Sequence, residues 1–406
     1  MKVLFLTHYF PPEVNAPASR TYEHCRVWVE HGHDVSVLTC VPNHPTGKVY
    51  PGYRNRLWQS EQISGVCVQH MWTLLAANRG VVWRSANYFS YMVMAIILAP
   101  FLPRTDVVVS TSPQFFCGLA GYFVSRLKRA PWILEIRDLW PESIVTVGAM
   151  KPSRATRFLE WLEGFAYRKA DRIVSVTDSF VDHIAAKCGD RAKIVVIKNG
   201  VDLEFFQPDA DGSALARNIG VEGRFVAAYV GTHGMAHGLD VILNAAERLR
   251  HRKDIVFVMA GDGAERERLL ARKTTLGLDN VLMLGQLPKE QMPQVWALTD
   301  VSLVLLRNQP LFESVLPSKV FEAMGMAKPI VLGVRGESQR LVEGSGAGLC
   351  IEPENAAQLA DTVALLADDR NRGREMGAAG RRYVAQNFDR RALAGKFEAL
   401  FASLTA

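Results

Sequence analysis

Short apolar runs alternate with amphipathic segments along the whole chain, and this alternation limits the fold more than any other feature of the sequence. Continuous runs of Val, Ile and Leu are typical of parallel strands that are buried on both faces. In the first half such runs occupy residues 2–7, 34–39, 66–70, 106–110, 132–136, 172–176 and 193–197. In the second half they occupy residues 225–230, 255–260, 280–284, 301–305 and 329–332. Helical patterns between them, as at 18–31, 113–128, 239–249 and 264–275, predict an α/β fold.

The 406-residue chain is too long for one ordinary hydrophobic core, so we expect two doubly wound domains. A linker-like stretch, NGVDLEFFQPDADG, starts at Asn199 and separates the two series of runs. We place the N-terminal domain at residues 1–205, the C-terminal domain at 206–385 and a last segment, helical over 390–404, at 386–406. Because open α/β sheets bind ligands at the carboxyl ends of their strands, functional side chains are expected in the loops that follow strands.

The composition limits the class of protein only loosely. A formal net charge of +6 is compatible with acidic ligands or an anionic membrane surface and is specific for neither. Six cysteines without a C-x-x-C pair are expected as small buried side chains in a reducing compartment, not as disulfides or a zinc site. The first apolar run is too short for a signal peptide and is predicted as a strand.

The most hydrophobic stretch, YFSYMVMAIILAPFL, covers residues 88–102. It is shorter than the ~20 apolar residues of a membrane span, and Pro100 interrupts its end. We expect a helix that packs on a sheet, and a helix that lies in a membrane interface is the alternative. Arg79, Arg84 and Arg104 flank the stretch, which suits an anionic interface.

The strongest chemical signal is the segment VLPSKVFEAMGMAKPI at residues 315–330. Pro317 suits the first turn of a helix, where free backbone N–H groups bind anions and Lys319 adds positive charge. Glu322 lies one helical turn beyond Ser318 on the same face, where a carboxylate can accept two hydrogen bonds from a ribose diol. The segment predicts a nucleotide site, and the alternative is an amphipathic helix with a solvated lysine and glutamate.

A glycine-rich turn follows a second-half strand in YVGTHGMAHGLD, at residues 229–240. Gly231, Gly234 and Gly238 permit close approach of the backbone to a phosphate. The side-chain donors that the turn adds belong to Thr232, His233 and His237. The histidine pair has no third ligand nearby and does not predict a metal site. An ordinary turn between a strand and a helix is the alternative.

The first half has two further candidate loops. EIRDLWPES, at residues 135–143, places the polar or aromatic side chains of Arg137, Asp138, Trp140 and Glu142 at the end of a core strand, where function is more common than in the core. The alternative is an ion pair between Arg137 and Asp138 that ties the loop. HYFPPEVNAPASR, at residues 8–20, follows the first strand.

In this order the motifs HYFPPE, RDLWPES, VGTHG, AGDG, LGQLP and PSKVFEAMGMAKPI resemble those of family 4 glycosyltransferases with the GT-B fold, and more closely those of bacterial O-antigen and capsule transferases. The resemblance covers essentially the whole chain, and PSKxFEAM together with DLWPES is its specific part. It implies two Rossmann-like domains that face each other across a cleft. It also implies that the last helix crosses back to the N-terminal domain.

The resemblance implies a retaining transfer that needs no metal ion. The C-terminal domain would hold a nucleotide-diphosphate sugar, expected as UDP with an N-acetylated hexosamine or deoxyhexosamine. The N-terminal domain would hold a lipid-linked saccharide on undecaprenyl diphosphate, in O-antigen or capsule synthesis. We expect a cytoplasmic enzyme that associates peripherally with the inner face of the plasma membrane and has no nucleic-acid partner. A sugar-nucleotide 2-epimerase and a non-catalytic nucleotide-sugar-binding protein are the alternatives.

The resemblance also suggests roles for individual residues. Glu322 would hold the ribose, while Ser318, Lys319 and the turn at 232–234 would hold the diphosphate. The remaining donor-binding candidates are Asn15, Ala16, Gly231, His237, Gln286, Leu287, Glu313, Ser314 and Pro317. Catalysis is assigned to Lys319, Glu322, Arg137 and Asp138. Acceptor binding is assigned to Trp140 and Glu142.

The chain departs from the family pattern at three places. The family often has two glutamates eight positions apart, but Ser314 stands eight before Glu322 and Glu313 is one residue off. His237-Gly238 replaces a Lys-Gly pair that contacts the diphosphate, and Arg137-Asp138 replaces a His-Asp pair. We therefore expect Lys319 to carry most of the positive charge that stabilises the leaving group.

Overall fold

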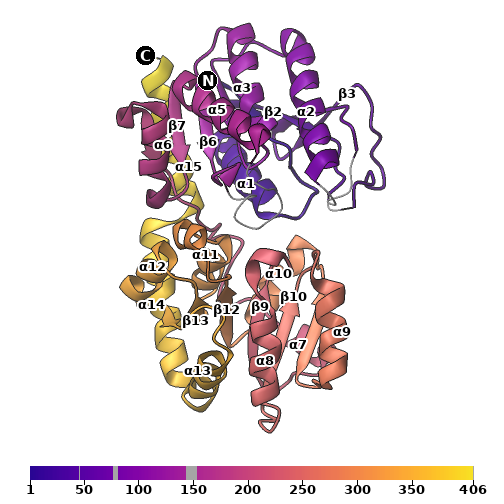
Figure 1. Ribbon diagram of the computed structural model, residues 1–406, viewed down its shortest axis with the longest axis vertical. Coiled ribbons are helices and arrows are strands. Elements are labelled where there is room, and N and C mark those ends of the chain that lie inside the picture. The colour runs from indigo at the N-terminus through magenta and orange to yellow at the C-terminus, as the bar shows by residue number, and fades with distance from the viewer. Residues whose placement is uncertain (45, 76–80, 143–152, 406) are drawn as a thin grey trace. The chain divides into compact units, whose positions relative to one another are not determined.

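The structure is a computed structural model that describes residues 1–44, 46–75, 81–142 and 153–405. It divides into two compact units, drawn in Figure 1. Unit 1 comprises Met1–Lys198 with Arg390–Ala406, and unit 2 comprises Asn199–Asp389.

Unit 1 contains an eight-stranded sheet in the order β3-β4-β2-β1-β5-β6-β7-β8, in which only β3 runs antiparallel to its neighbour. Its strands are β1 (Lys2–Leu6), β2 (Asp34–Cys40), β3 (Trp58–Ile63), β4 (Val66–Met71), β5 (Val107–Thr111), β6 (Trp132–Ile136), β7 (Arg172–Ser175) and β8 (Ile194–Val196). All seven strands predicted for the first half are present, and β3 is an additional edge strand.

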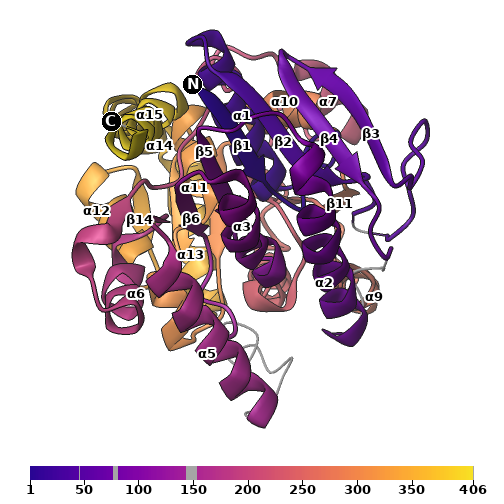
Figure 2. The ribbon, with the colours of Figure 1, turned by 90° about the horizontal axis from the view of Figure 1, so that it is seen from above.

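Helices cover both faces of this sheet (Figure 2). One face carries α1 (Ala16–Glu30) and α15 (Arg390–Thr405). The other face carries α2 (Val81–Leu98), α3 (Phe115–Lys128), α5 (Arg154–Lys169) and α6 (Val181–Cys188). Short 3-10 turns are η1 (Ala99–Phe101), η2 (Asp178–Phe180) and η3 (Arg191–Lys193). This layering is the doubly wound arrangement that the alternating pattern predicts.

The last helix, α15, belongs to the N-terminal unit, as the resemblance implies. The indole N–H of Trp28 donates to the carbonyl of Ala394 at 3.1 Å, and the Arg390 guanidinium lies 2.9 Å from the Glu23 carboxylate. Phe397 is fully buried in the same core cluster as Trp28. The helix therefore completes one of the two helical layers of unit 1.

The hydrophobic stretch at 88–102 forms most of α2 and η1. Tyr91, Ala95 and Leu98 are buried against the sheet, which confirms the predicted packing. Other apolar side chains of α2 remain exposed. Arg79 lies outside the described residues. No helix in the described part of the chain combines the length and hydropathy needed to cross a bilayer.

Unit 2 contains a six-stranded, fully parallel sheet in the order β11-β10-β9-β12-β13-β14. The strands are β9 (Phe225–Val230), β10 (Ile255–Ala260), β11 (Val281–Gly285), β12 (Val301–Leu305), β13 (Ile330–Gly333) and β14 (Gly348–Cys350). The first five correspond to the predicted runs, and β14 is additional.

The helices of unit 2 lie before, between and after these strands. They are α7 (Ser213–Ile219), α8 (Asp240–Arg248), α9 (Arg266–Leu276), α10 (Met292–Ala297), α11 (Ser318–Gly325), α12 (Glu337–Ser345), α13 (Ala356–Asp368) and α14 (Arg370–Asn387). Three 3-10 turns, η4 (Met235–His237), η5 (Lys289–Gln291) and η6 (Pro310–Ser314), lie in loops that follow strands. α8, α9 and α13 share one core cluster with the sheet.

The structure divides after Lys198 and after Asp389, whereas the sequence placed the boundaries at 205/206 and 385/386. The segment after Lys198 is bonded to the end of α14, because the N–H of Val201 donates to the carbonyl of Phe388 at 3.1 Å. Arg381 in α14 donates to the carbonyl of Phe206 at 3.1 Å. These bonds place the start of the expected linker in unit 2.

Candidate functional site

Three loops of unit 2 are hydrogen-bonded to one another at the carboxyl edge of its sheet. The N–H of Gly231, after β9, donates to Ala260 at the end of β10 at 2.9 Å. The N–H of His233 donates to the carbonyl of Asp262 at 2.8 Å, and the N–H of Arg307, after β12, donates to Ala236 at 2.9 Å. The site therefore rests on adjacent parallel strands, where open α/β sheets bind ligands.

Two glycines let these loops approach closely. Gly231 has φ +139°, and a Cβ placed there would lie 3.0 Å from the Lys319 ammonium nitrogen. Gly261 has φ +142°, and a Cβ there would lie 1.9 Å from the carbonyl oxygen of Gly231. Only glycine adopts such backbone angles readily and leaves that space open. Backbone amides can thus lie next to a ligand without an intervening side chain.

Lys319 lies in the first turn of α11, directly after Pro317 and Ser318. Its ammonium nitrogen is buried, has no hydrogen-bond partner among the described residues, and lies 3.8 Å from the centre of the Tyr229 ring. Burial lowers the pKa of Lys319 to about 7, against an opposing attraction from the Glu322 carboxylate. Buried cations of this kind are costly unless a ligand neutralises them.

Two histidines of the turn after β9 lie close enough to Lys319 to feel its charge. His233 is buried, and neither of its ring nitrogens has a hydrogen-bond partner in the described part of the chain. Burial lowers the pKa of His233 to about 4 and that of His237 to about 3, and the Lys319 charge contributes to both shifts. Both rings are therefore neutral at pH 7 and can act as uncharged donors. The N–H at Nδ1 of His237 donates to the carbonyl of Leu305 at 3.4 Å.

The other predicted donor residues lie around this centre in unit 2. Glu322 is half-buried on α11, one turn beyond Ser318, and Thr232 is exposed next to His233. Gln286 is exposed and Leu287 half-buried after β11, whose Gly285 accepts the N–H of Gly261 at 2.7 Å. The structure brings together the lysine, the glycine turn and the histidines as the sequence predicts.

The two alternatives for the first family glutamate differ in their contacts. Glu313 is exposed in η6. The Ser314 hydroxyl donates to the carbonyl of Leu311 at 2.6 Å, so it is used within its own turn. Ser314 therefore has a structural role in its turn, and Glu313 is the exposed residue of the two.

In unit 1 the predicted residues mainly hold the loop after β1. Asn15 caps α1, because its side-chain oxygen accepts the N–H of Ala18 at 2.9 Å. Arg137 donates to the carbonyls of Ala16 and Pro17, both at 3.3 Å, and burial lowers its pKa to about 9. Arg137, expected as a catalytic residue, thus positions the segment that carries Asn15 and Ala16.

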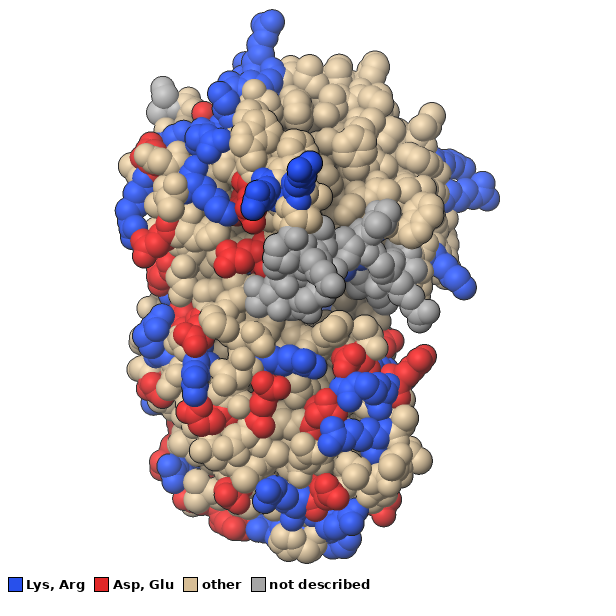
Figure 3. Space-filling view, viewed as in Figure 1, with Lys and Arg blue, Asp and Glu red and all other residues tan. Residues whose placement is uncertain are grey.

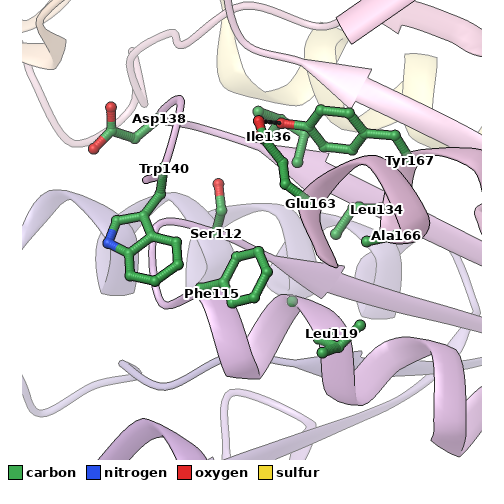
Figure 4. A pocket seen from close by; sticks show the side chains of 11 residues that line it. Ser112, Phe115, Leu119, Leu134, Ile136, Asp138, Trp140, Glu163, Ala166 and Tyr167 are labelled. Atoms are coloured by element: carbon green, nitrogen blue, oxygen red, sulfur yellow. Dashed lines mark hydrogen bonds between the residues drawn. The ribbon is translucent and has the colours of Figure 1, made fainter. Parts of the chain in front are cut away.

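The loop after β6 lines a small cavity, shown in Figure 4. Trp140 stacks on Phe115 with ring centres 4.6 Å apart, and Asp138 lines the same cavity. Tyr167 donates to the buried Glu163 at 2.8 Å on the other side, away from Asp138 in the view of Figure 4. Glu142 is exposed, with its carboxylate 3.5 Å from Nδ1 of His183. Trp140 and Glu142 therefore differ in setting, since only Trp140 lines the cavity.

Sequence reasoning missed two features of the sites. Tyr229, whose ring lies against Lys319, stands within an apolar run with no signal beyond its aromatic type. The Arg20 guanidinium lies 2.8 Å from the Glu135 carboxylate, both almost completely buried, and Thr111 donates to the same carboxylate at 2.7 Å. The sequence signal for this pair was Glu135 inside the apolar strand WILEI, because a buried carboxylate needs a charged or hydrogen-bonding partner.

The described residues contain no group of three or more His, Cys, Asp or Glu arranged to hold a metal ion. The chain does contain one Asp-x-Asp sequence, at Asp209 and Asp211. Both side chains are exposed ahead of α7, and Asp211 accepts the N–H of Ser213 at 2.8 Å. The Asp211 side chain is therefore bonded within the turn that precedes α7.

Fold and site together define a class: a protein with two parallel-sheet domains, the second of which holds a buried lysine beside a glycine turn at the carboxyl edge of its sheet. Two family models match the chain, one on each unit. The model described as Glycosyl transferase 4-like domain matches residues 15–200, and the model described as Glycosyl transferases group 1 matches residues 215–383. The chain belongs to the family 4 glycosyltransferases and is a transferase enzyme.

Individual relatives agree with this membership. WcaI of Escherichia coli (strain K12), named for glycosyl transfer in colanic acid biosynthesis, is 22% identical over 371 residues, which are 88% of this chain and 90% of WcaI. Sucrose-phosphate synthase from Thermosynechococcus elongatus has a TM-score of 0.79 at 17% identity, over 99% of this chain and 98% of that one. HepE from Anabaena in complex with UDP-glucose has a TM-score of 0.72 at 17% identity, over 100% of both chains. The fold is therefore GT-B, and the two alternative functions gain no support from these matches.

Proposed function

We propose that the chain transfers a sugar, with retention of configuration, from a nucleoside diphosphate donor held in unit 2. The observation that carries this proposal is the buried Lys319 ammonium, which has no hydrogen-bond partner among the described residues and faces a glycine turn. A diphosphate is the ligand that such a cation and the backbone N–H groups at the start of α11 suit best. The complex of HepE with UDP-glucose supports UDP as the nucleotide.

Stabilisation of the leaving group is the proposed source of catalysis. The bond between sugar C1 and the β-phosphate oxygen breaks, and negative charge accumulates on the diphosphate. Lys319 and the N–H groups at the start of α11 offset that charge, and preorganised dipoles of this kind commonly contribute more to catalysis than any other effect. Glu322 would hold the ribose hydroxyls. The acceptor hydroxyl attacks C1 from the leaving-group face, and no protein nucleophile is assigned.

The proposed acceptor is a saccharide linked to undecaprenyl diphosphate, taken up by unit 1 near Trp140. The transferred sugar is proposed to be an N-acetylated hexosamine or a deoxyhexosamine, for an O-antigen or capsule glycan. The name of WcaI, which refers to colanic acid biosynthesis, supports a role in a surface polysaccharide. Because the acceptor stays in the bilayer, the enzyme would work at the cytoplasmic face of the plasma membrane as a peripheral protein.

A thermal-shift screen against nucleotide sugars tests the donor site. A ligand at 100 times its Kd should add about 2.7 kcal/mol of stability. We expect one UDP-sugar to raise the Tm of the wild type and to have no effect on Lys319→Met. If no nucleoside diphosphate sugar stabilises the wild type, the donor assignment fails.

A further inference from the structure

Exposed apolar side chains gather on one helical face of unit 1, formed by α2, η1, α3 and α5. Nine of the fourteen exposed large hydrophobic side chains in the described residues lie on these four elements. Those exposed by more than half are Trp83, Ile97, Phe101, Leu127, Phe158 and Trp161. Soluble proteins rarely leave large aromatic and aliphatic groups exposed in one region unless that region binds something. We call this region the outer helical face.

Ring contacts connect the helices of the outer helical face. Phe89 of α2 lies against Phe116 of α3 with ring centres 5.6 Å apart. Tyr122 of α3 lies 5.1 Å from Phe165 of α5, and Trp161 stacks on Phe165 at 6.1 Å. Figure 2 shows α2, α3 and α5 in succession across the same side of the sheet. The exposed groups thus form a single surface.

Basic side chains outnumber acidic ones on this surface: α5 carries Arg154, Arg157, Arg168 and Lys169, with Glu160 as its exposed acidic residue. Residues 72–134, which contain α2, η1 and α3, hold six Lys and Arg and one acidic residue, Asp106. Arg126 lies over the Tyr122 ring at 5.6 Å, and Arg84 lies over the Tyr88 ring at 6.0 Å. Over α2 and α3, the space-filling view in Figure 3 shows uncharged side chains with basic residues at the edge.

We propose that the outer helical face is a docking surface for an anionic lipid bilayer. Aromatic rings and basic side chains at one surface match the apolar interior and negative headgroups of such a bilayer. A second copy of the chain would bring two surfaces with an excess of basic residues together, so the charge favours the bilayer. The proposal deepens the proposed function and rests on it, because a lipid-linked acceptor requires unit 1 to reach the membrane.

The test is co-sedimentation of the full-length protein with vesicles of phosphatidylcholine alone or mixed with phosphatidylglycerol. The wild type should sediment with the mixed vesicles at low salt, and high salt or phosphatidylcholine alone should release it. Phe158→Ser with Trp161→Ser, and separately Arg104→Glu with Arg126→Glu, should weaken binding by about tenfold or more, given what apolar and basic groups contribute at a bilayer surface. Leu365→Ser and Arg372→Glu, exposed on unit 2, are matched controls and should bind as the wild type does.

Failure of the wild type to sediment at low salt would overturn the proposal. Equal binding to both vesicle types would also overturn it, and so would an equal loss of vesicle binding in the unit 2 control variants. A third contradicting result is a wild type that forms a dimer but does not bind vesicles, with Trp161→Ser dissociating the dimer. Donor-induced stabilisation of the same variants in solution separates the two claims. Lost vesicle binding with intact donor stabilisation confirms the surface, whereas a wild type that binds vesicles but no nucleotide sugar contradicts the proposed function alone.

Discussion

A buried lysine without a hydrogen-bond partner is an unfavourable arrangement for the empty protein. Burial lowers the pKa of Lys319 from 10.5 to about 7, so the folded chain resists the charged form that the proposed catalysis needs. A bound diphosphate would supply the missing negative charge and return the pKa of Lys319 toward its ordinary value. The residue proposed to stabilise the leaving group thus destabilises the empty fold, as is common for functional residues.

Lys319→Met should stabilise the empty protein on the order of 2 kcal/mol at pH 7, several degrees in Tm, while it abolishes stabilisation by the donor. The folded pKa of Lys319 is about 7 and the unfolded value is 10.5. Between these values the unfolded chain binds more protons, so wild-type stability rises with pH. The Tm advantage of the mutant should therefore be largest below pH 7 and shrink toward pH 10. A Tm difference between mutant and wild type that stays constant across this pH range would show that the pKa of Lys319 is not lowered in the folded protein.

Glu322→Gln keeps the shape of the side chain and removes the charged acceptor proposed for the ribose. We expect donor affinity to fall about tenfold to a hundredfold, since hydrogen bonds to charged groups contribute roughly 1.5–3 kcal/mol. Turnover should fall too, and the circular dichroism spectrum should stay unchanged. Wild-type kinetics in the folded variant would remove the ribose assignment.

At the scale of single elements, the turn between β9 and α8 depends on backbone that only glycine adopts readily. Gly231→Ala would force a side chain to φ +139° and place its Cβ 3.0 Å from the lysine nitrogen. We expect the variant to lose donor binding measured by calorimetry and to lose about 1–3 kcal/mol of stability. Gly344→Ala, in α12 with open space around its Cβ, is the control and should be neutral or slightly stabilising. Equal donor binding in both variants would contradict the role of the turn.

The strands with continuous apolar runs were predictable because a strand that is buried on both faces has apolar residues at successive positions. β3 was missed because WQSEQI is a polar edge strand whose residues alternate in exposure and which pairs only with β4. β14 has only three residues, too few for a pattern. α1 starts at Ala16, ahead of the predicted 18, because Asn15 supplies the cap.

The candidate site was predictable where it is local in sequence. The glycine turn and the PSK segment follow strands, and strand order brings them together. The bonds from Arg137 to Ala16 and Pro17 join segments more than a hundred residues apart, and no local pattern encodes them. The same holds for Tyr229 against Lys319.

At the scale of the whole molecule, we predict that transfer needs no metal ion. Lys319 and backbone amides would supply the positive charge that a divalent cation supplies elsewhere. Activity in EDTA should stay within about twofold of the activity of the untreated enzyme. The removal of a catalytic metal would cause a much larger loss of activity. Complete loss that Mn²⁺ or Mg²⁺ restores would show that a metal site exists, with Asp209 and Asp211 the first residues to mutate.

The measurement that tests the central claim most directly follows a radiolabelled sugar from a UDP-sugar into lipid. Purified protein is incubated with the donor that the thermal-shift screen selects and with bacterial membrane lipid extract, and the organic phase is counted while released UDP is assayed. The wild type should move label into the organic phase with one UDP released per sugar, and Lys319→Met should do neither. An epimerised donor formed without lipid, or tight donor binding with no transfer to any lipid fraction, would contradict the account.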